Sequence, residues 1–235
     1  MRSNSYTLTF ISAVTVVLGF LLSLAAESLR EKQEINVELD MKKNILTALA
    51  FEQNPSQPWT SLDIENLFKK SVRYNQIDKN GNLIKNSSET SKSESEQEGF
   101  TLYEKIINGK VEGYAIPISG KGLWSTLYGY LAIEPDGRSV KGITFYAHKE
   151  TPGLGGEVEK PWFKNNFIGK QFADEEGNLT GIQVIKGKVS VDDPKKNHKV
   201  DGISGATMTC KGLNKFLKED LEKYEPFFKQ IRAGV

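Results

Sequence analysis

The feature that most constrains this chain is an uncharged, apolar stretch near its start, from Leu8 to Ala26. A helix of that length rises about 28 Å, which is close to the ~30 Å thickness of the hydrocarbon core of a bilayer. The stretch exceeds the apolar core of a signal peptide, and Arg2 alone precedes it where a signal peptide carries a basic cluster. We therefore predict a single transmembrane anchor within residues 1–30. A secreted form, cleaved after Ser23-Leu24-Ala25, is the alternative.

Charge and cysteine content exclude several classes of function. Arg2 lies on one side of the apolar stretch, and Arg30 and Lys32 lie on the other, so charge hardly favours either orientation. The formal net charge of +1 argues against a nucleic-acid partner, because neutralising phosphates requires a basic excess. A single cysteine, Cys210, and two histidines far apart in sequence do not suffice for a disulfide framework, an iron–sulfur cluster or a zinc site. We expect no metal site, so an organic cofactor must carry any redox chemistry.

The segment that follows the anchor is predicted to be mainly helical. Residues 27–51 carry apolar side chains at helical spacing. A second helix is expected from Leu62 to Val72, with Thr60 or Ser61 as its N-cap. Residues 85–99 are rich in Ser and Glu and cannot form a core, which predicts a flexible loop.

From Phe100 onward the sequence predicts strands joined by tight turns, so the expected domains are 1–30 (anchor), 31–99 (helical segment with a flexible loop) and 100–235. The predicted fold class is α+β: a single transmembrane helix followed by a mainly antiparallel sheet with packed helices. Two further helices are expected, one over Glu157–Asn165 and one from about Ala206 to Phe228. The expected turns are Asn80-Gly81, Asn108-Gly109 between Leu102–Ile107 and Val111–Ile118, Glu134-Pro135-Asp136-Gly137 between Leu127–Ile133 and Val140–His148, and Lys186-Gly187 between Leu179–Ile185 and Lys188–Val191.

A first candidate site lies at the start of the final helix, from Asp201 to Thr207. Ser204 can act as the N-cap, and the small Gly205 and Ala206 leave the first N–H groups uncovered. Such a helix start binds anions through free donors and the helix dipole, and Thr207 would present its hydroxyl beside that site. Asp201 is expected to fix the loop before Ser204 through local backbone hydrogen bonds. The residues alone are explained at least as well by a helix start without a ligand, because N-caps are far commoner than phosphate sites.

A second candidate site is the glycine-rich loop that follows a predicted strand and precedes a helix. Its hydroxyl and backbone amides, at Thr151, Gly153 and Leu154, can bind the polar edge of a planar ring, and the Leu154 side chain can cover its face. An ordinary strand-to-helix connection is the alternative for this loop. Trp124 can stack on a ring, although a tryptophan is more often part of a core. The candidate residues of the loop are His148, Glu150, Thr151, Gly153, Leu154 and Gly155.

Both segments resemble motifs of one protein family. Asp201–Thr207 resembles the Asp-x-x-Ser/Thr-Gly-Ala-Thr motif of the FMN-binding domain family, and His148–Gly155 resembles its His-x-Glu-Thr-Pro-Gly-Leu-Gly motif. Gly122–Ala132 and Gly142–His148 are similar to stretches of the NqrC family, the C subunits of Na+-translocating NADH:quinone reductases. The G subunit of the Rnf complex shares both motifs. The resemblance covers nearly the whole chain except Lys85–Gly99.

The resemblance implies an FMN joined to Thr207 as a phosphoester by a separate flavin transferase that uses FAD. It implies an electron carrier between other subunits, which together oxidise NADH, reduce quinone and pump Na+. It also implies a single-pass protein of the bacterial inner membrane, with the globular domain on the periplasmic or outer side. The resemblance further implies that the chain has no catalytic residues of its own for NADH or quinone. The absence of a dinucleotide fingerprint from the sequence agrees with this expectation. The Rnf protein and a cofactor-free, membrane-tethered binding or sensory domain are the rival interpretations.

Overall fold

The computed structural model describes residues 3–54, 56–84 and 99–234, and it divides into two units, Met1–Asp40 and Met41–Val235. The first unit consists of most of helix α1 (Asn4–Ala48). By length and composition, α1 can cross a membrane, and none of its most apolar window is buried, which agrees with the predicted anchor. The expected flexible loop over residues 85–99 lies outside the described residues, apart from Gly99.

The second unit is built on an antiparallel sheet, which confirms the predicted α+β class. Its six described strands are arranged in the order β2-β1-β3-β4-β5-β6, and every neighbouring pair is antiparallel. The β3–β4 turn is the one predicted: Asn108 and Gly109 have φ values of 51° and 77°, as a two-residue hairpin requires. The strands are β1 (Val72–Ile77), β2 (Leu83–Ile84), β3 (Phe100–Ile107), β4 (Lys110–Lys121), β5 (Thr126–Ile133) and β6 (Val140–Ala147).

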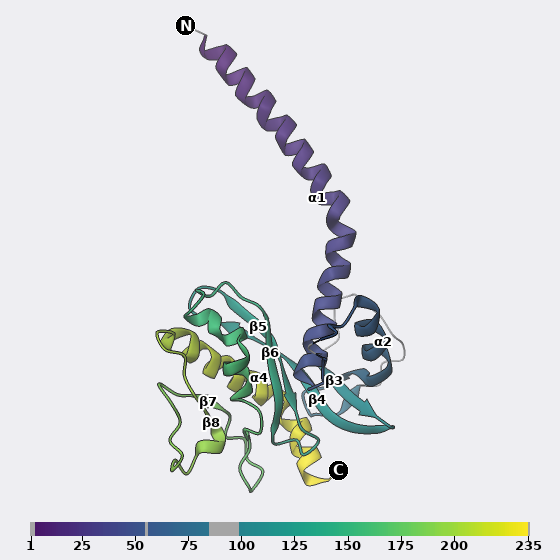
Figure 1. The fold of residues 1–235 in the computed structure, drawn as a ribbon, viewed down its shortest axis with the longest axis vertical. Helices are drawn as coiled ribbons and strands as arrows, with labels where there is room; N and C mark the ends of the chain where they lie inside the picture. Colours follow the sequence, from purple (N-terminus) through teal and green to yellow (C-terminus); the bar gives the residue numbers. More distant parts are fainter. Residues whose placement is uncertain (1–2, 55, 85–98, 235) are drawn as a thin grey trace. The chain divides into compact units, whose positions relative to one another are not determined.

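Helices cover both faces of this sheet, and Figure 1 shows α4 (Thr207–Ala233) on one of them. Because side chains alternate along a strand, Leu127 and Leu131 of β5 join the core under α4, whereas Tyr130 joins the core on the other face. The last turns of α1, with Ile45, and helix α2 (Ser61–Ser71) pack on that second face. Each face of the sheet therefore carries a hydrophobic core of its own.

Helix α2 begins where the sequence predicts. The Thr60 hydroxyl accepts a hydrogen bond from the Asp63 amide at 3.3 Å, and the Asp63 carboxylate accepts one from the Thr60 amide at 2.9 Å. This reciprocal capping box satisfies two N–H groups that the helix itself leaves unpaired, and it confirms Thr60 as the N-cap.

The helix expected over Glu157–Asn165 is instead two short elements. A 3-10 helix, η1, spans Gly155–Glu159, and helix α3 spans Pro161–Asn165. Lys160 between them is extended, with φ −74° and ψ 144°. The residue before a proline is disfavoured in the helical region, so Pro161 separates the two elements.

The predicted hairpin between Leu179–Ile185 and Lys188–Val191 is wrong. Strand β7 (Gln183–Val184) pairs in parallel with β8 (Lys199–Val200), and Lys188–Val191 is not a strand. On the other side of β7, the Asn214 amide of α4 accepts from the Val184 N–H at 2.7 Å and donates to its carbonyl at 2.9 Å. A helix side chain therefore replaces the strand partner that the sequence suggested.

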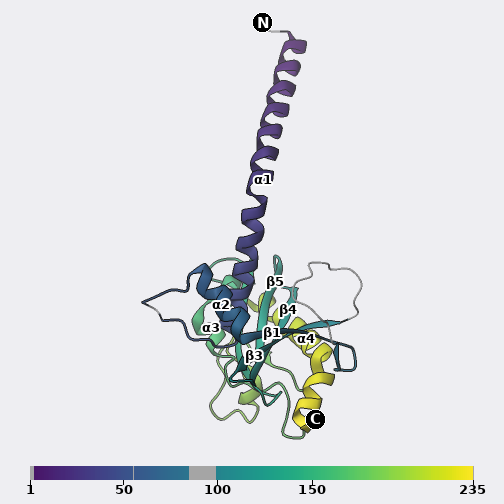
Figure 2. The same ribbon diagram turned by 90° about the vertical axis from the view of Figure 1, so that its right-hand side faces the viewer.

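Helix α4 runs beside β4, as the turned view in Figure 2 shows. Asp220 accepts a hydrogen bond from the Ser119 amide of β4 at 2.9 Å, and the Tyr224 hydroxyl donates to the Thr101 carbonyl of β3 at 2.7 Å. These bonds satisfy backbone groups of the sheet that neighbouring strands do not pair. The helix is thus fixed along its length by polar as well as apolar contacts.

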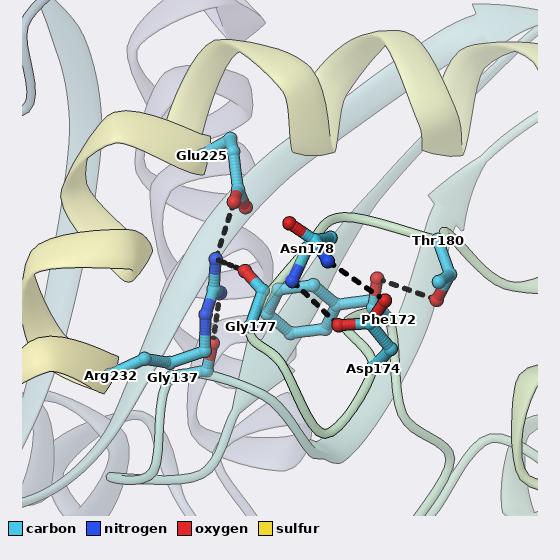
Figure 3. A network of polar contacts seen from close by, with 8 residues as sticks. All are labelled: Gly137, Phe172, Asp174, Gly177, Asn178, Thr180, Glu225 and Arg232. Atoms are coloured by element: carbon cyan, nitrogen blue, oxygen red, sulfur yellow. Dashed lines mark hydrogen bonds and ion pairs between the residues drawn. The ribbon is translucent and has the colours of Figure 1, made fainter.

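The end of α4 is fixed by a buried arginine (Figure 3). Arg232 donates to the carbonyls of Gly137, at 2.7 Å, and Gly177, at 3.1 Å, and it forms an ion pair with Glu225. Its guanidinium lies 6.0 Å from the ring centre of Phe172. One side chain therefore joins α4 to the turn after β5 and to the turn at residues 174–178.

Candidate functional site

Helix α4 starts later than predicted, and Ser204 is not its N-cap. The cap residue is Ala206, with φ −114° and ψ 36°, and no side chain caps the helix. Gly205 adopts φ +74°, so the chain makes a further turn between Ser204 and the helix. Thr207 is consequently the first helical residue, and it is exposed. Its hydroxyl lies at a helix start, where the first N–H groups have no partner within the helix.

The approach to this helix start is held by the segment before β8, and Asp201 does not act as predicted. Instead of local bonds, its carboxylate accepts from the Val189 amide at 2.8 Å. The Gly202 amide donates to the Gly187 carbonyl at 2.8 Å, and a Cβ at Gly202 would collide with the Ile185 carbonyl. Residues 201 and 202, which lead to Thr207, are therefore held in place by contacts with residues 185–189.

The glycine-rich loop lies against the start of α4. Leu154 is 42 % exposed, and a Cβ at Gly205 would lie 2.6 Å from Leu154 Cδ2. Within the loop, the Leu154 amide donates to the Thr151 carbonyl at 3.1 Å, so that amide is not available to a ligand as predicted. Gly153 has φ +76°, and a Cβ built there would have no atom beyond its chain neighbours within 4 Å, which leaves this part of the loop open. The two candidate sites are thus one.

Glu150 joins this loop to the β4–β5 turn and to α4. Its carboxylate is buried, with Oε1 accepting from the amides of Trp124, at 2.9 Å, and Ser125, at 3.1 Å. Oε2 accepts from the Leu123 amide at 3.3 Å and from the Thr209 hydroxyl at 2.6 Å. Burial raises the pKa of Glu150, but these hydrogen bonds outweigh it and hold the pKa below its ordinary value. The carboxylate is therefore ionised at neutral pH.

His148 supports the same loop. Its Nδ1 accepts from the Glu150 amide at 3.2 Å, and its Nε2 lies 3.5 Å from the Glu159 carboxylate. The Lys149 amide donates to the Ser125 hydroxyl at 2.6 Å, a second tie to the β4–β5 turn. His148 thus contacts the loop and η1, and these contacts give it a supporting role.

Four exposed apolar side chains lie on the three chain segments that these contacts join, one of which carries Thr207; we call them the apolar rim. Trp124 is 69 % exposed, so it is not a core residue. Exposed apolar groups that gather around a polar group indicate a binding surface more than a stability role. The apolar rim consists of Leu123, Trp124, Leu154 and Met208.

Two residues of α4 that tie it to other segments escaped the sequence analysis: Thr209, which binds Glu150 at the site, and Asn214, which holds β7. The signal for Asn214 is a polar residue beside the buried Leu213 and Leu217 of an amphipathic helix. Gly155 of the loop packs closely against Thr209, because a Cβ at position 155 would lie 2.6 Å from Thr209 Oγ1.

The start of α4 lies against β4 at a glycine, and this contact gives a first prediction. A Cβ at Gly212 would collide with the Lys121 carbonyl oxygen. Gly212→Ala is expected to lower the free energy of unfolding by about 1–2 kcal/mol, because overpacking outweighs the ~1 kcal/mol by which alanine favours a helix. Urea unfolding of the detergent-solubilised chain measures it, with the exposed neighbour Lys211→Ala as control. An unchanged or raised midpoint would show that the helix does not depend on this close approach.

Comparisons with known proteins agree with this geometry. The family described as "FMN-binding domain" matches residues 122–222. The C subunit of the Na(+)-translocating NADH-quinone reductase of Vibrio anguillarum is 32 % identical, over 97 % of this chain and 95 % of its own. Its counterpart in Pseudomonas aeruginosa is 44 % identical over 57 % of this chain and 52 % of its own. The crystal structure of the counterpart from Parabacteroides distasonis covers 85 % of this chain and 96 % of its own, with a TM-score of 0.70 and 28 % identity. That of Shewanella oneidensis NqrC covers 83 % and 97 %, with a TM-score of 0.67 and 29 % identity.

Proposed function

Because the chain belongs to the NqrC family, the C subunits of Na(+)-translocating NADH-quinone reductases, we propose that it is the electron-carrier subunit of such a complex and carries electrons on an FMN. Other subunits of the complex would oxidise NADH, reduce quinone and transport Na+. One observation supports the position of the flavin. The exposed Thr207 begins α4 beside the glycine-rich loop, whose Leu154 side chain packs against Gly205. The family match favours this assignment over the Rnf protein.

The residues at this place fit an FMN. The start of α4 offers unpaired N–H groups and the positive end of the helix dipole to a phosphate. Position 205 requires a glycine, because any side chain there would adopt a strained φ of +74° and would collide with the Leu154 side chain. The apolar rim offers flat and branched apolar groups to the faces of a ring. Phosphate and ring would therefore each meet groups of matching polarity.

Thr207 would hold the cofactor through a phosphoester. In the attachment step, catalysed by a flavin transferase, Thr207 Oγ forms a bond to the flavin-side phosphorus of FAD. The bond between the two phosphoryl groups breaks, AMP leaves with the electron pair, and the hydroxyl proton passes to solvent. The ester prevents loss of the cofactor as its oxidation state changes.

The residues around the ring would position it and adjust its environment. When bound, FMN supplies the redox chemistry, and the protein supplies orientation and electrostatics. Thr151 and Gly153 would face the polar edge of the ring, while Leu154 and Trp124 would cover its faces. The rim is exposed, so the redox centre of another protein in the complex can approach it. Helix α1 would anchor the chain as a single-pass protein of the bacterial inner membrane, with the sheet unit on the periplasmic side.

Intact mass spectrometry tests the proposal. The chain is expressed with and without a flavin transferase, purified in detergent and weighed. We expect a mass gain of one FMN less one water, in the presence of the transferase alone, together with a yellow colour. A colourless protein of unchanged mass after coexpression with an active transferase would overturn the proposal and favour a cofactor-free binding domain.

A further inference from the structure

Glu150 has no capacity left for a ligand. It is 5 % exposed, and four donors already occupy its two oxygens. A carboxylate offers about four acceptor positions, so this one is fully used by the protein. Although Glu150 belongs to the loop motif, it therefore acts from beneath the site and does not bind the cofactor directly.

Two glycines make room for this carboxylate. A Cβ at Gly122 would lie 2.7 Å from Glu150 Oε1, and a Cβ at Gly155 would lie 2.7 Å from Oε2. Any side chain at either position would displace the carboxylate from its donors. The glycines on both sides of Glu150 and its four hydrogen bonds thus form one arrangement, built from three segments far apart in sequence.

Each of the three segments also carries an exposed residue of the proposed flavin site. The β4–β5 turn carries Trp124, the glycine-rich loop carries Leu154, and the first turn of α4 carries Thr207, two residues before Thr209. The hydrogen bond from Thr209 to Glu150 spans 59 residues of sequence and is the shortest of the four. Charge-assisted hydrogen bonds of this kind are stronger than neutral ones.

From this geometry we propose that Glu150 is a positioning residue, which preforms the flavin-attachment site by holding the first turn of α4, through Thr209, against the β4–β5 turn. The inference rests on the proposed function, since it concerns the attachment at Thr207. The transferase would therefore bind a folded surface on which the Thr207 hydroxyl, the glycine-rich loop and the apolar rim already have their final positions. The buried negative charge of Glu150 also remains beneath the flavin afterwards.

The test compares two matched sets of variants in the full-length chain. Glu150→Gln keeps the shape of the side chain but removes its charge. Its new NH2 group would face a backbone N–H, that of Leu123 or that of Trp124, so that two donors would oppose each other. Thr209→Val removes only the hydroxyl, Thr209→Ser restores it, and Glu175→Gln is an exposed carboxylate control. Purified flavin transferase and FAD are added, and the initial rate of covalent labelling is measured by in-gel fluorescence.

We expect Glu150→Gln and Thr209→Val to label at least about tenfold more slowly, because small misplacements of a reacting group carry penalties of this size or larger. Thr209→Ser and Glu175→Gln should label at the wild-type rate. The labelled fraction of Glu150→Gln should have a more positive flavin midpoint potential than that of Thr209→Val, since a negative charge that disfavours reduction is gone.

The outcomes separate the two proposals. If the wild-type chain is not labelled, the proposed function fails. If the wild type is labelled and Thr209→Val labels equally fast, the role of Glu150 is overturned while the flavin assignment stands. Should Glu150→Gln fail to fold, the Thr209→Val and Thr209→Ser pair decides alone.

Discussion

Replacing Thr207 with valine is expected to abolish covalent flavin attachment completely and to leave the fold unchanged. Valine has the same branched shape as threonine but no hydroxyl, so the phosphoester cannot form. Thr207 is exposed at the first position of α4, and no side chain caps the helix there. Exposed substitutions of this kind usually change the free energy of unfolding by less than about 0.5 kcal/mol. In-gel flavin fluorescence after coexpression with the transferase measures the loss.

Thr207→Ser is the matched control, because it keeps the hydroxyl and loses only the methyl group. It should remain fluorescent, and peptide mapping should place its adduct at residue 207. Fluorescence that persists in Thr207→Val, or an adduct mapped to another hydroxyl such as that of Ser204, would refute the assignment to Thr207. Both variants change the same exposed first residue of α4, and of the two only serine keeps a hydroxyl that can form the ester.

Local signals in the sequence predicted much of the fold. The Asn108-Gly109 turn was predictable because a two-residue hairpin requires two left-handed residues, which the structure has. The start of α2 was predicted from Thr60 or Ser61 as its N-cap, and the structure has Thr60, in a capping box with Asp63. In both cases the residues that decide the structure are neighbours in the chain.

Tertiary contacts decided the parts that the sequence did not predict. The Asn214 side chain pairs with Val184, 30 residues away, and so replaces the hairpin partner expected for β7. Helix α4 starts later than predicted because Gly205 takes a left-handed conformation. In that conformation Gly205 lies against Leu154 of a loop distant in sequence. Nothing local to either segment encodes these partners.

The same distinction applies to the candidate site. The two motifs were found from residue types alone, but their contact through Leu154 and Gly205 was not visible in the sequence. Glu150 was recognised as part of a motif, yet three of its four donors are backbone amides, which any residue type supplies. Its partner Thr209 was missed for the same reason, because a threonine within a helix gives no signal of a distant carboxylate.

Helix α4 is therefore fixed at both ends by buried charged groups, Glu150 at its start and Arg232 at its end. If the helix moved along β4, Thr207 would move with it. Arg232 contacts the turns at Gly137 and Gly177 (Figure 3), whereas the start of α4 contacts the β4–β5 turn and the glycine-rich loop. A substitution of Arg232 tests the stability of the unit without touching the proposed flavin site.

Arg232→Met is expected to lower the free energy of unfolding by about 3–5 kcal/mol, the usual consequence of removing one partner of a buried ion pair. The arginine side chain is 6 % exposed, and its loss leaves Glu225 without its ion-pair partner, with Lys229 as a remaining cationic neighbour, and removes a donor from the Gly137 and Gly177 carbonyls. Burial already raises the pKa of Glu225, and Arg232 lowers it, so the variant should raise that pKa further. Urea unfolding of the full chain in detergent measures the loss, with exposed Lys218→Met as a control near zero.

The pH dependence and a second substitution identify the cause. A carboxyl group whose pKa is raised on folding stabilises the fold below its unfolded pKa, and that stability is lost as pH rises through the folded pKa. The loss in Arg232→Met should therefore be smaller near pH 4 than at pH 7. Arg232→Met combined with Glu225→Gln should be more stable at pH 7 than Arg232→Met alone, because no unpaired charge remains buried. A loss that is independent of pH and equal in both variants would assign the effect to packing around Phe172 instead of to the ion pair.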